Sequence, residues 1–334
     1  MTVRATEHRG GASVRIDEIR AHRSLRRGIA LGTALCCTLV AVLAPATGPH
    51  LRSALRLHDF LHVPGFGLVA GALLFGFPGP ARARRLDRLG RLFVVFVAVV
   101  VDGAAVELLQ AALGGAADPW DVVRDGVGAA AVVLAAASSG RGSGAPLRWG
   151  LRAAALGGVL AAFAPSARAI ADEVRAGRQF PVLADFRSSA QLDRFGWSAW
   201  STGVFERKGG AGTDGALRLH LRPGAYPGLW LEFFPRDWRG RSEFSFDCTN
   251  PSSTPLRVTV RIDDLSHDED YADRFNGKFL LAPGRNHVRI PLADVETAPR
   301  GRKLLLAEIR HVGVFAVDLA EPRDLVFHEF RLSP

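Results

Sequence analysis

Six polar side chains that can exchange protons or form hydrogen bonds interrupt the apolar first half of the chain: His62, Glu107, Gln110, Asp121, Arg124 and Asp125. Glu107 and Gln110 are three residues apart, and Asp121 and Asp125 are four apart, so each pair shares a helix face. Ionisable groups within membrane segments are costly and mark functional sites. We therefore expect a polar membrane pocket, in which Glu107, His62, Asp121 and Asp125 are candidate acid–base catalysts. The alternative is that these groups only pair with one another or cap helices.

A second dense group of polar residues lies between residues 261 and 276 (R-I-D-D-L-S-H-D-E-D-Y-A-D-R-F-N). Sugar recognition uses planar hydrogen-bonding groups together with an aromatic face. The predicted ligand-binding residues are Trp230, Trp238, Asp264, His267, Tyr271, Asp273, Arg274 and Asn276. A solvated acidic loop with local ion pairs explains the pattern equally well. The spacing does not fit an EF-hand, and we predict no cofactor.

These groups must be positioned by two kinds of element, the first of which is a set of apolar segments. Residues 28–47, 60–77, 92–113, 121–137 and 149–171 approach the length of about 20 residues that a membrane helix needs. The fold class expected for the first half is therefore an α-helical transmembrane bundle of about five helices.

The charge distribution suggests an orientation for that bundle. The chain has a net charge of +9, and from residue 180 onward basic and acidic residues balance, so the excess lies in the first half. Arginines gather before the first segment and between the second and third, which places the N-terminus in the cytoplasm by the positive-inside rule. Five crossings would then put the second half outside. Basic residues spread between apolar runs do not indicate nucleic-acid binding.

The first apolar segment has one further interpretation. Its arginine-rich flank and the sequence Ala44-Pro45-Ala46 are also typical of a cleaved signal peptide.

The second half changes to a two-residue period. Residues 216–221, 243–247, 256–262 and 287–290 alternate apolar and polar, and Gly and Pro punctuate the stretches between them. This pattern predicts an all-β antiparallel sandwich. The expected organisation is a basic arm (1–27), a membrane bundle (28–171), a linker (172–181) and an extracytoplasmic sandwich (182–334).

The polar residues of the bundle resemble the signature of the VanZ-like membrane family over residues 28–140. His62, Glu107, Gln110, Asp121 and Gly128 match the family pattern, whereas Asp125 occupies the position of its asparagine. The resemblance implies a cell-envelope role, since the family was first associated with teicoplanin (glycopeptide) resistance.

The second half resembles carbohydrate-binding modules with a galactose-binding-like, jelly-roll-like sandwich. Residues 183–186 (L-A-D-F) and 327–332 (F-H-E-F-R-L) resemble the first and last strands of that fold. The resemblance implies a possible structural calcium ion, for which Asp185 and Glu329 are candidates by position only.

Together these features predict a multi-pass protein of the bacterial plasma membrane whose outer domain binds an envelope glycan or glycolipid. An enzyme acting on a lipid-linked envelope substrate is the first alternative. A structural anchor displaying a protein-interaction sandwich is the second.

Overall fold

The computed structural model describes residues 7–43, 51–78, 85–115, 117–140, 144–207 and 215–334. The chain divides into two compact units, Met1–Ala167 and Arg168–Pro334, and each is described by itself. Ala44-Pro45-Ala46 and several arginines between the second and third apolar segments lie outside the described residues.

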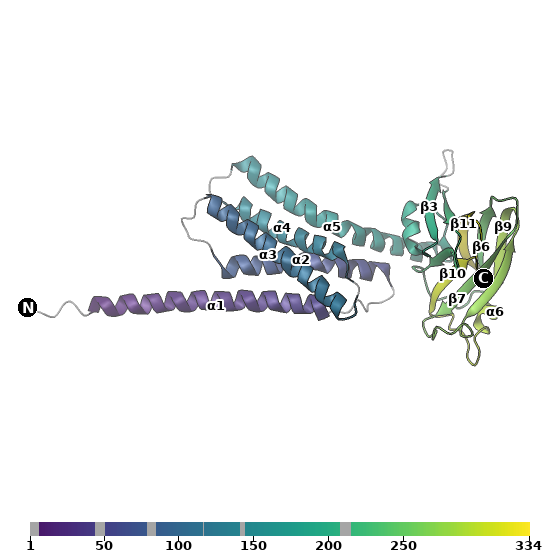
Figure 1. Cartoon of the computed structure of the whole chain (residues 1–334), viewed down its shortest axis with the longest axis horizontal. Helices are drawn as coiled ribbons and strands as arrows, with labels where there is room; N and C mark the ends of the chain where they lie inside the picture. Colours follow the sequence, from purple (N-terminus) through teal and green to yellow (C-terminus); the bar gives the residue numbers. More distant parts are fainter. Residues whose placement is uncertain (1–6, 44–50, 79–84, 116, 141–143, 208–214) are drawn as a thin grey trace, which may run out of the picture. The chain divides into compact units, whose positions relative to one another are not determined.

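Helices make up the first unit (Figure 1). They are α1 (Glu7–Leu43), α2 (Arg52–Gly76), α3 (Arg85–Ala112), α4 (Pro119–Ser138) and the first part of α5 (Ala145–Gln179), whose residues from Arg168 onward belong to the second unit. Four helices of the described residues, all except α4, are long and apolar enough to cross a membrane. α4 has 20 residues and carries Asp121, Arg124 and Asp125 in its first two turns. Five helices therefore form as expected, and each of α2 to α5 extends beyond its apolar run because helical hydrogen bonding does not require apolar side chains.

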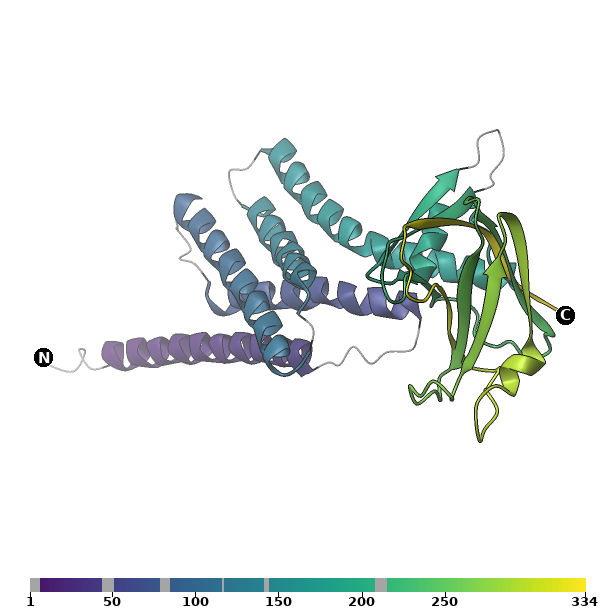
Figure 2. The same cartoon turned by 45° about the vertical axis from the view of Figure 1, so that its right-hand side comes forward.

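The apolar side chains of the first unit are divided between a small core and an exposed surface. Phe66, Val99 and Ala129 pack together with four further buried residues from α2, α3 and α4, and these helices contact one another (Figures 1 and 2). Phe93 and Val101 are 66% and 62% exposed. Water does not favour such exposure, whereas lipid does.

The segment expected as a linker is partly helical. α5 continues through Gln179, and within the second unit Asp172 makes a two-pronged ion pair with Arg194, with both N–O distances 2.8 Å. Arg194 is completely buried and also donates to the carbonyl oxygen of Leu183 at 2.6 Å. The polar composition of this segment therefore serves a buried ion pair as well as solvent contact.

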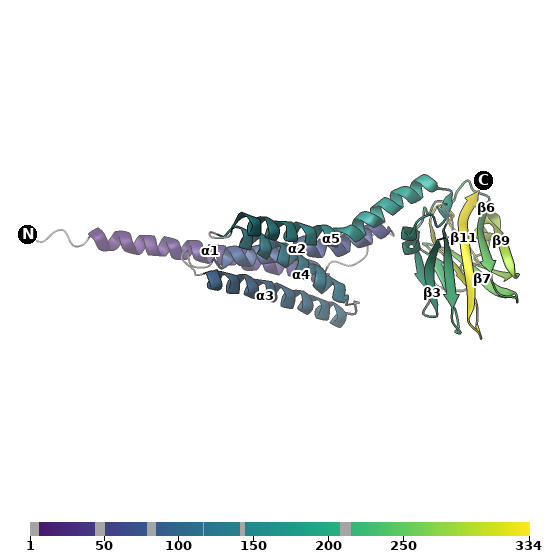
Figure 3. The same ribbon diagram turned by 90° about the horizontal axis from the view of Figure 1, so that it is seen from above.

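The second unit is a sandwich of two antiparallel sheets. One has the order β3 (Ser201–Arg207), β4 (Gly215–Leu221), β11 (Arg323–Ser333), β6 (Glu243–Asn250), β9 (Gly284–Pro291), with β1 (Val182–Ala184) also on β11. β11, β6 and β9 run side by side in Figure 3. The other has the order β2 (Phe195–Trp197), β5 (Gly228–Leu231), β10 (Ile309–Phe315), β7 (Leu256–Asp264), β8 (Phe275–Leu281). The 3₁₀ helix η1 (Ser189–Arg194) and the short helix α6 (Leu292–Glu296) lie in connections.

The alternation in sequence places the core between the sheets. Leu256, Val258, Val260 and Ile262 of β7 are buried in one large cluster with Phe246, Phe327, Phe330 and other residues of both sheets. Arg257, Thr259, Arg261 and Asp263 alternate with them and therefore lie on the opposite face of the five-stranded sheet. The fold class expected for each half is confirmed.

Candidate functional site

His62 of α2 lies between two carboxylates of α4. Its Nδ1 is 2.9 Å from Oδ1 of Asp125, and its Nε2 is 3.5 Å from Oδ2 of Asp121. Asp125 is completely buried and His62 is 8% exposed. A buried carboxylate that bonds one imidazole nitrogen fixes the orientation of the ring and leaves the other nitrogen for proton exchange.

Arg124 neutralises the more exposed side of this group. Its guanidinium bonds Asp121 one turn earlier and lies 3.4 Å from Asp118 and 3.5 Å from Asp59 of α2. One cation is thus shared by three carboxylates, which leaves the group acidic.

Glu107 joins the same group from α3. The backbone N–H of Asp118 donates to its Oε2 at 2.6 Å, and the residue is 5% exposed. Oε1 of Glu107 and Oδ2 of Asp125 are buried and find no hydrogen-bond partner in the described chain. Because a buried acceptor without a donor is costly, these two atoms mark a point of the unit where hydrogen bonding is incomplete. We call Asp59, His62, Glu107, Asp118, Asp121, Arg124 and Asp125 the helical cluster.

Gln110 does not join the helical cluster. Its Nε2 donates to the carbonyl oxygen of Ala41 on α1 at 3.1 Å. Five of the six residues expected in the membrane pocket therefore come together, and the sixth connects α3 to α1.

Two glycines allow the helices of the cluster to approach. A Cβ on Gly103 of α3 would lie 2.3 Å from Oδ2 of Asp125, and one on Gly128 of α4 would lie 2.0 Å from the carbonyl oxygen of Val63. Neither approach tolerates a side chain. Gly128 therefore sets the α2–α4 contact, and Gly103 makes room for the buried carboxylate.

The second unit carries an aromatic strip, formed by Tyr226, Phe315 and Trp230, on the face of the five-stranded sheet away from the core. The ring centroids of Tyr226 and Phe315 are 5.9 Å apart, and those of Phe315 and Trp230 are 5.5 Å apart. Tyr226 is 55% exposed. The guanidinium carbon of Arg261 lies 5.4 Å from the centroid of the Trp230 ring. Trp230 was expected from the sequence, whereas Tyr226, Phe315 and Arg261 were not.

Planar polar groups continue from the strip. Nε of Arg261 donates to Oδ2 of Asp263 at 2.7 Å, and Nδ1 of His311 is 3.4 Å from Oδ1 of the same carboxylate. Burial raises the pKa of Asp263, but His311 and Arg261 outweigh it and hold the pKa below its ordinary value. Asp263 is thus an ionised group that orients Arg261 and His311 beside the strip.

Tyr271, Arg274 and Asn276 form a group of their own at the neighbouring strand. The guanidinium of Arg274 lies 5.2 Å from the ring centroid of Tyr271, and its Nε donates to Asn276 at 3.2 Å. Asn276 is paired with Arg261 in the β7–β8 register. These three predicted residues therefore lie near Arg261, whose guanidinium contacts Trp230 at the end of the aromatic strip.

Asp264 and Asp273, also expected to bind a ligand, are instead bonded by Arg302. The guanidinium donates to Asp264 at 2.6 and 2.9 Å and to Asp273 at 2.5 and 2.7 Å. The hydrogen bonds from Arg302 lower the pKa of Asp273 to about 2. His267 bonds the backbone oxygen of Asp273 through Nδ1 at 3.0 Å. These residues connect one loop to another, and nothing in the local sequence identifies Arg302 as their partner.

Trp238 lies in the core. It is completely buried and its ring stacks on Phe244 at a centroid distance of 5.4 Å. It therefore presents no face to a ligand, which corrects its placement among the ligand-binding residues.

Possible metal ligands in the described chain include one group, His267, Asp268 and Asp273. Arg302 already donates to both carboxylate oxygens of Asp273. The guanidinium of Arg302 therefore supplies the positive charge that a metal ion would bring to these oxygens. Asp185 accepts from Gln191 at 2.8 Å, and Glu329 pairs with Arg331 at 3.1 Å. The calcium ion expected at Asp185 and Glu329 stays a prediction.

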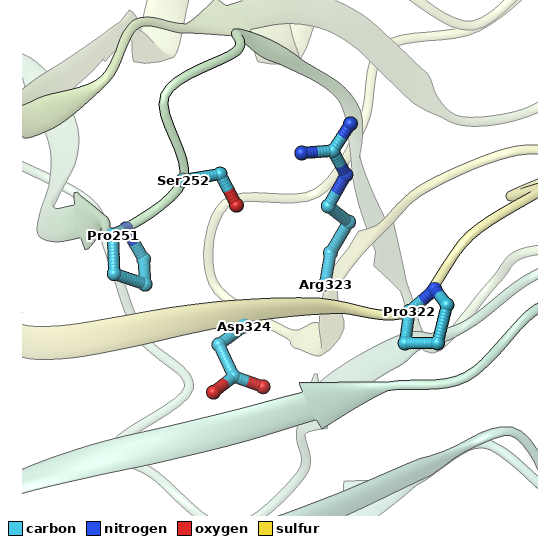
Figure 4. A pocket seen from close by; sticks show the side chains of 5 residues that line it. All are labelled: Pro251, Ser252, Pro322, Arg323 and Asp324. Atoms are coloured by element: carbon cyan, nitrogen blue, oxygen red, sulfur yellow. The ribbon is translucent and has the colours of Figure 1, made fainter.

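A shallow hollow of about 320 Å³ opens at the edge of the sandwich, lined by Pro251, Ser252, Pro322, Arg323 and Asp324 (Figure 4). Arg323 and Asp324 are successive residues of β11 and point to opposite sides of it. Arg323 donates to Thr254 at 2.6 Å, and Asp324 bonds His220 at 2.8 Å. Its charged groups are thus engaged with neighbours, and aromatic residues do not line it.

Comparison with solved structures gives matches that cover less than half of this chain. No family model and no curated protein matches the chain. An exo-β-agarase structure is 13% identical over 46% of this chain and 24% of its own, with a TM-score of 0.38. A family 11 carbohydrate-binding module from Clostridium thermocellum, in complex with a mixed-linked tetrasaccharide, is 13% identical over 46% of this chain and 94% of its own, with a TM-score of 0.35. The chain thus spans about a quarter of the agarase. The fold assignment rests on the strand order and register given above.

Proposed function

We propose that this chain is a VanZ-like protein of the bacterial plasma membrane that carries a glycan-binding sandwich on the outer side. The aromatic strip is the observation that carries the proposal. Tyr226 is 55% exposed and Trp230 is half-buried, so these two rings provide apolar faces for sugar rings, while Phe315, which is 9% exposed, packs between them and supports them. Arg261 and Asn276 beside it supply donors and acceptors for hydroxyl groups.

Attachment to the membrane strengthens weak binding of this kind. Aromatic stacking on one sugar ring is worth on the order of 1 kcal/mol. An anchored domain meets a surface polymer at high local concentration, so modest affinity is sufficient.

The test uses the full chain in non-ionic detergent micelles, applied to an array of bacterial envelope and plant glycans. We expect binding that falls about five-fold in Trp230→Ala and in Tyr226→Ala, and less in Tyr271→Ala. Val204→Ala is the matched control, since Val204 is 44% exposed on β3 of the other sheet. Absence of binding to every glycan by a folded protein would contradict the proposal.

A second function, acid–base chemistry on a lipid-linked envelope substrate, is favoured by the helical cluster. The bond from His62 to buried Asp125 leaves Nε2 on the side of Asp121 and Arg124, which is the arrangement of an oriented general base. Glu107 supplies a second carboxyl group with one unpartnered oxygen in the described chain.

This second function is tested in a deletion strain complemented with His62→Ala or Glu107→Gln. Accumulation of a lipid-linked envelope intermediate, measured by mass spectrometry, is the expected result. His58→Ala, four residues earlier on α2, is the control. An unchanged lipid profile at normal expression of both variants excludes catalysis by the cluster.

A further inference from the structure

The outer face of β7 and β8 has more positive charge than its neighbours neutralise. Arg257, Thr259 and Arg261 follow one another on this face, and Lys278 is paired with Thr259 across the strands. Same-face residues on one strand are about 7 Å apart, and diagonal cross-strand neighbours about 7–8 Å. Arg257, Lys278 and Arg261 therefore form a continuous row of cations, which leads to the aromatic strip at Arg261.

Two of the carboxylates on this side, Asp263 and Glu269, are already paired. Asp263 bonds Arg261 at 2.7 Å. Glu269 bonds Arg310 at 3.0 Å and lies 3.6 Å from Arg261. Arg257 and Lys278 are exposed, and neither forms an ion pair with any residue that the structure describes. Two cations thus remain for an external anion.

Arg274 adds a fourth positive charge to the same region. Burial, followed by the positive charge of Arg261, lowers the pKa of Arg274 below its ordinary value. Its guanidinium is placed against Tyr271 and Asn276, and a carboxylate bond to it is absent from the described contacts. Like charges kept close together favour a bound anion.

We propose that the glycan recognised by the aromatic strip is acidic, with carboxylate or phosphate groups that lie along Arg257, Lys278 and Arg261. This inference rests on the proposed glycan binding and adds the chemical class of the ligand. In this arrangement the aromatic strip contacts the sugar rings, and the row of cations binds the acidic groups of the polymer.

The test compares polygalacturonate with its carboxyl-reduced, neutral form, using the full chain in non-ionic detergent micelles. The two polymers have the same glycosidic backbone, and the neutral form has a hydroxymethyl group in place of each carboxylate. We expect the acidic polymer to bind at least tenfold more tightly at about 50 mM salt, and this preference to collapse at about 500 mM, where screening is strong. A poly(glycerol phosphate) arm distinguishes phosphate from carboxylate as the preferred anion.

Variants separate charge recognition from ring stacking. Arg257→Gln and Lys278→Gln each weaken binding of the acidic polymer about two- to five-fold, as expected for an exposed charge pair, and leave the neutral polymer unaffected. Trp230→Ala weakens the binding of both polymers. Arg285→Gln, a 73% exposed cation on β9 of the other sheet, changes neither.

The outcomes distinguish the two proposals. Equal affinity for both polymers, or binding to neutral glycans alone, overturns the acidic ligand and leaves glycan binding in place. Binding to no glycan at all overturns both. If the protein binds anionic phospholipid vesicles and binds none of the glycans, the cations serve to contact a membrane surface, and both proposals are overturned.

Discussion

The indole of Trp230 lies across the backbone of Gly313, its partner in the β5–β10 register. A Cβ on Gly313 would lie 2.1 Å from the indole ring. The aromatic strip therefore depends on a residue that has no side chain and no chemistry of its own.

Replacing this glycine is expected to displace the ring. Gly313→Ala should weaken glycan binding about as much as Trp230→Ala, and overpacking should lower the free energy of unfolding of the second unit by about 1–3 kcal/mol. Glycan titration and urea unfolding measure the two effects. Gly177→Ala, where nothing lies within 4 Å of the added Cβ, should change neither. Unaltered binding by Gly313→Ala would show that the position of the indole is not needed.

The helical cluster depends on Gly128 in the same way. In Gly128→Ala the new Cβ meets the carbonyl oxygen of Val63, which cannot move without shifting α2. We expect a loss of about 1–3 kcal/mol, seen as a lower temperature of aggregation in detergent. The control is Gly71→Ala on α2, which has open space around its added Cβ. Equal stability of the two variants would contradict the close α2–α4 contact.

The second unit should lose stability in acid through Asp273. Its pKa falls from an ordinary value of 3.8 to about 2 because Arg302 bonds its carboxylate. A lowered folded-state pKa contributes stability that is complete above the unfolded pKa and is lost as the pH falls through the folded one. The loss therefore lies between about pH 4 and 2.

Urea unfolding followed by tryptophan fluorescence, repeated across this pH range, measures that slope. Asp273→Asn should be less stable at neutral pH and should flatten the acid dependence. Asp294→Asn, at an exposed site in α6, should leave the slope unchanged. If the free energy of unfolding of Asp273→Asn depends on pH as it does in the wild type, this carboxylate does not contribute to the loss of stability in acid.

The side of the membrane on which the sandwich lies depends on how many helices cross. Five crossings put it outside when the N-terminus is inside, whereas four put both ends on one side. The test uses a background in which Cys36 and Cys37 are replaced by Ser, so that Cys248 is the one remaining cysteine. Burial raises the pKa of the Cys248 thiol to about 12, so this thiol does not react with a maleimide. We expect Arg285→Cys in this background to react with a membrane-impermeant maleimide on intact cells. Labelling only after permeabilisation would place the sandwich in the cytoplasm.

The limits of helical spacing as a predictor are visible at α3. Glu107 and Gln110 share a face by sequence, yet Glu107 accepts from Asp118 while Gln110 bonds Ala41 of α1. Residues three apart differ by about 60° around a helix, which is enough to direct them to different neighbours. Asp121 and Asp125 differ by only about 40°, and both reach His62.

The loop from 264 to 276 shows a second limit. Its acidic and histidine residues suggest a ligand site, but their partner, Arg302, lies 38 residues from Asp264 and 29 from Asp273. Local composition cannot tell a bound ligand from a distant arginine, because both satisfy the same carboxylates.

The sequence alone determined the two kinds of element, since hydrophobic length and two-residue alternation act on each segment separately. It also identified His62, Glu107, Asp121 and Asp125 as ionisable groups within apolar segments, and Trp230 as a candidate aromatic face for a sugar. Only the tertiary structure decided their partners. It joined His62 to Asp125, buried Trp238, satisfied Asp273 with Arg302, and completed the aromatic strip with Tyr226 and Phe315. The reason is that partnership depends on distance in space, which strand order and helix packing set and local sequence does not.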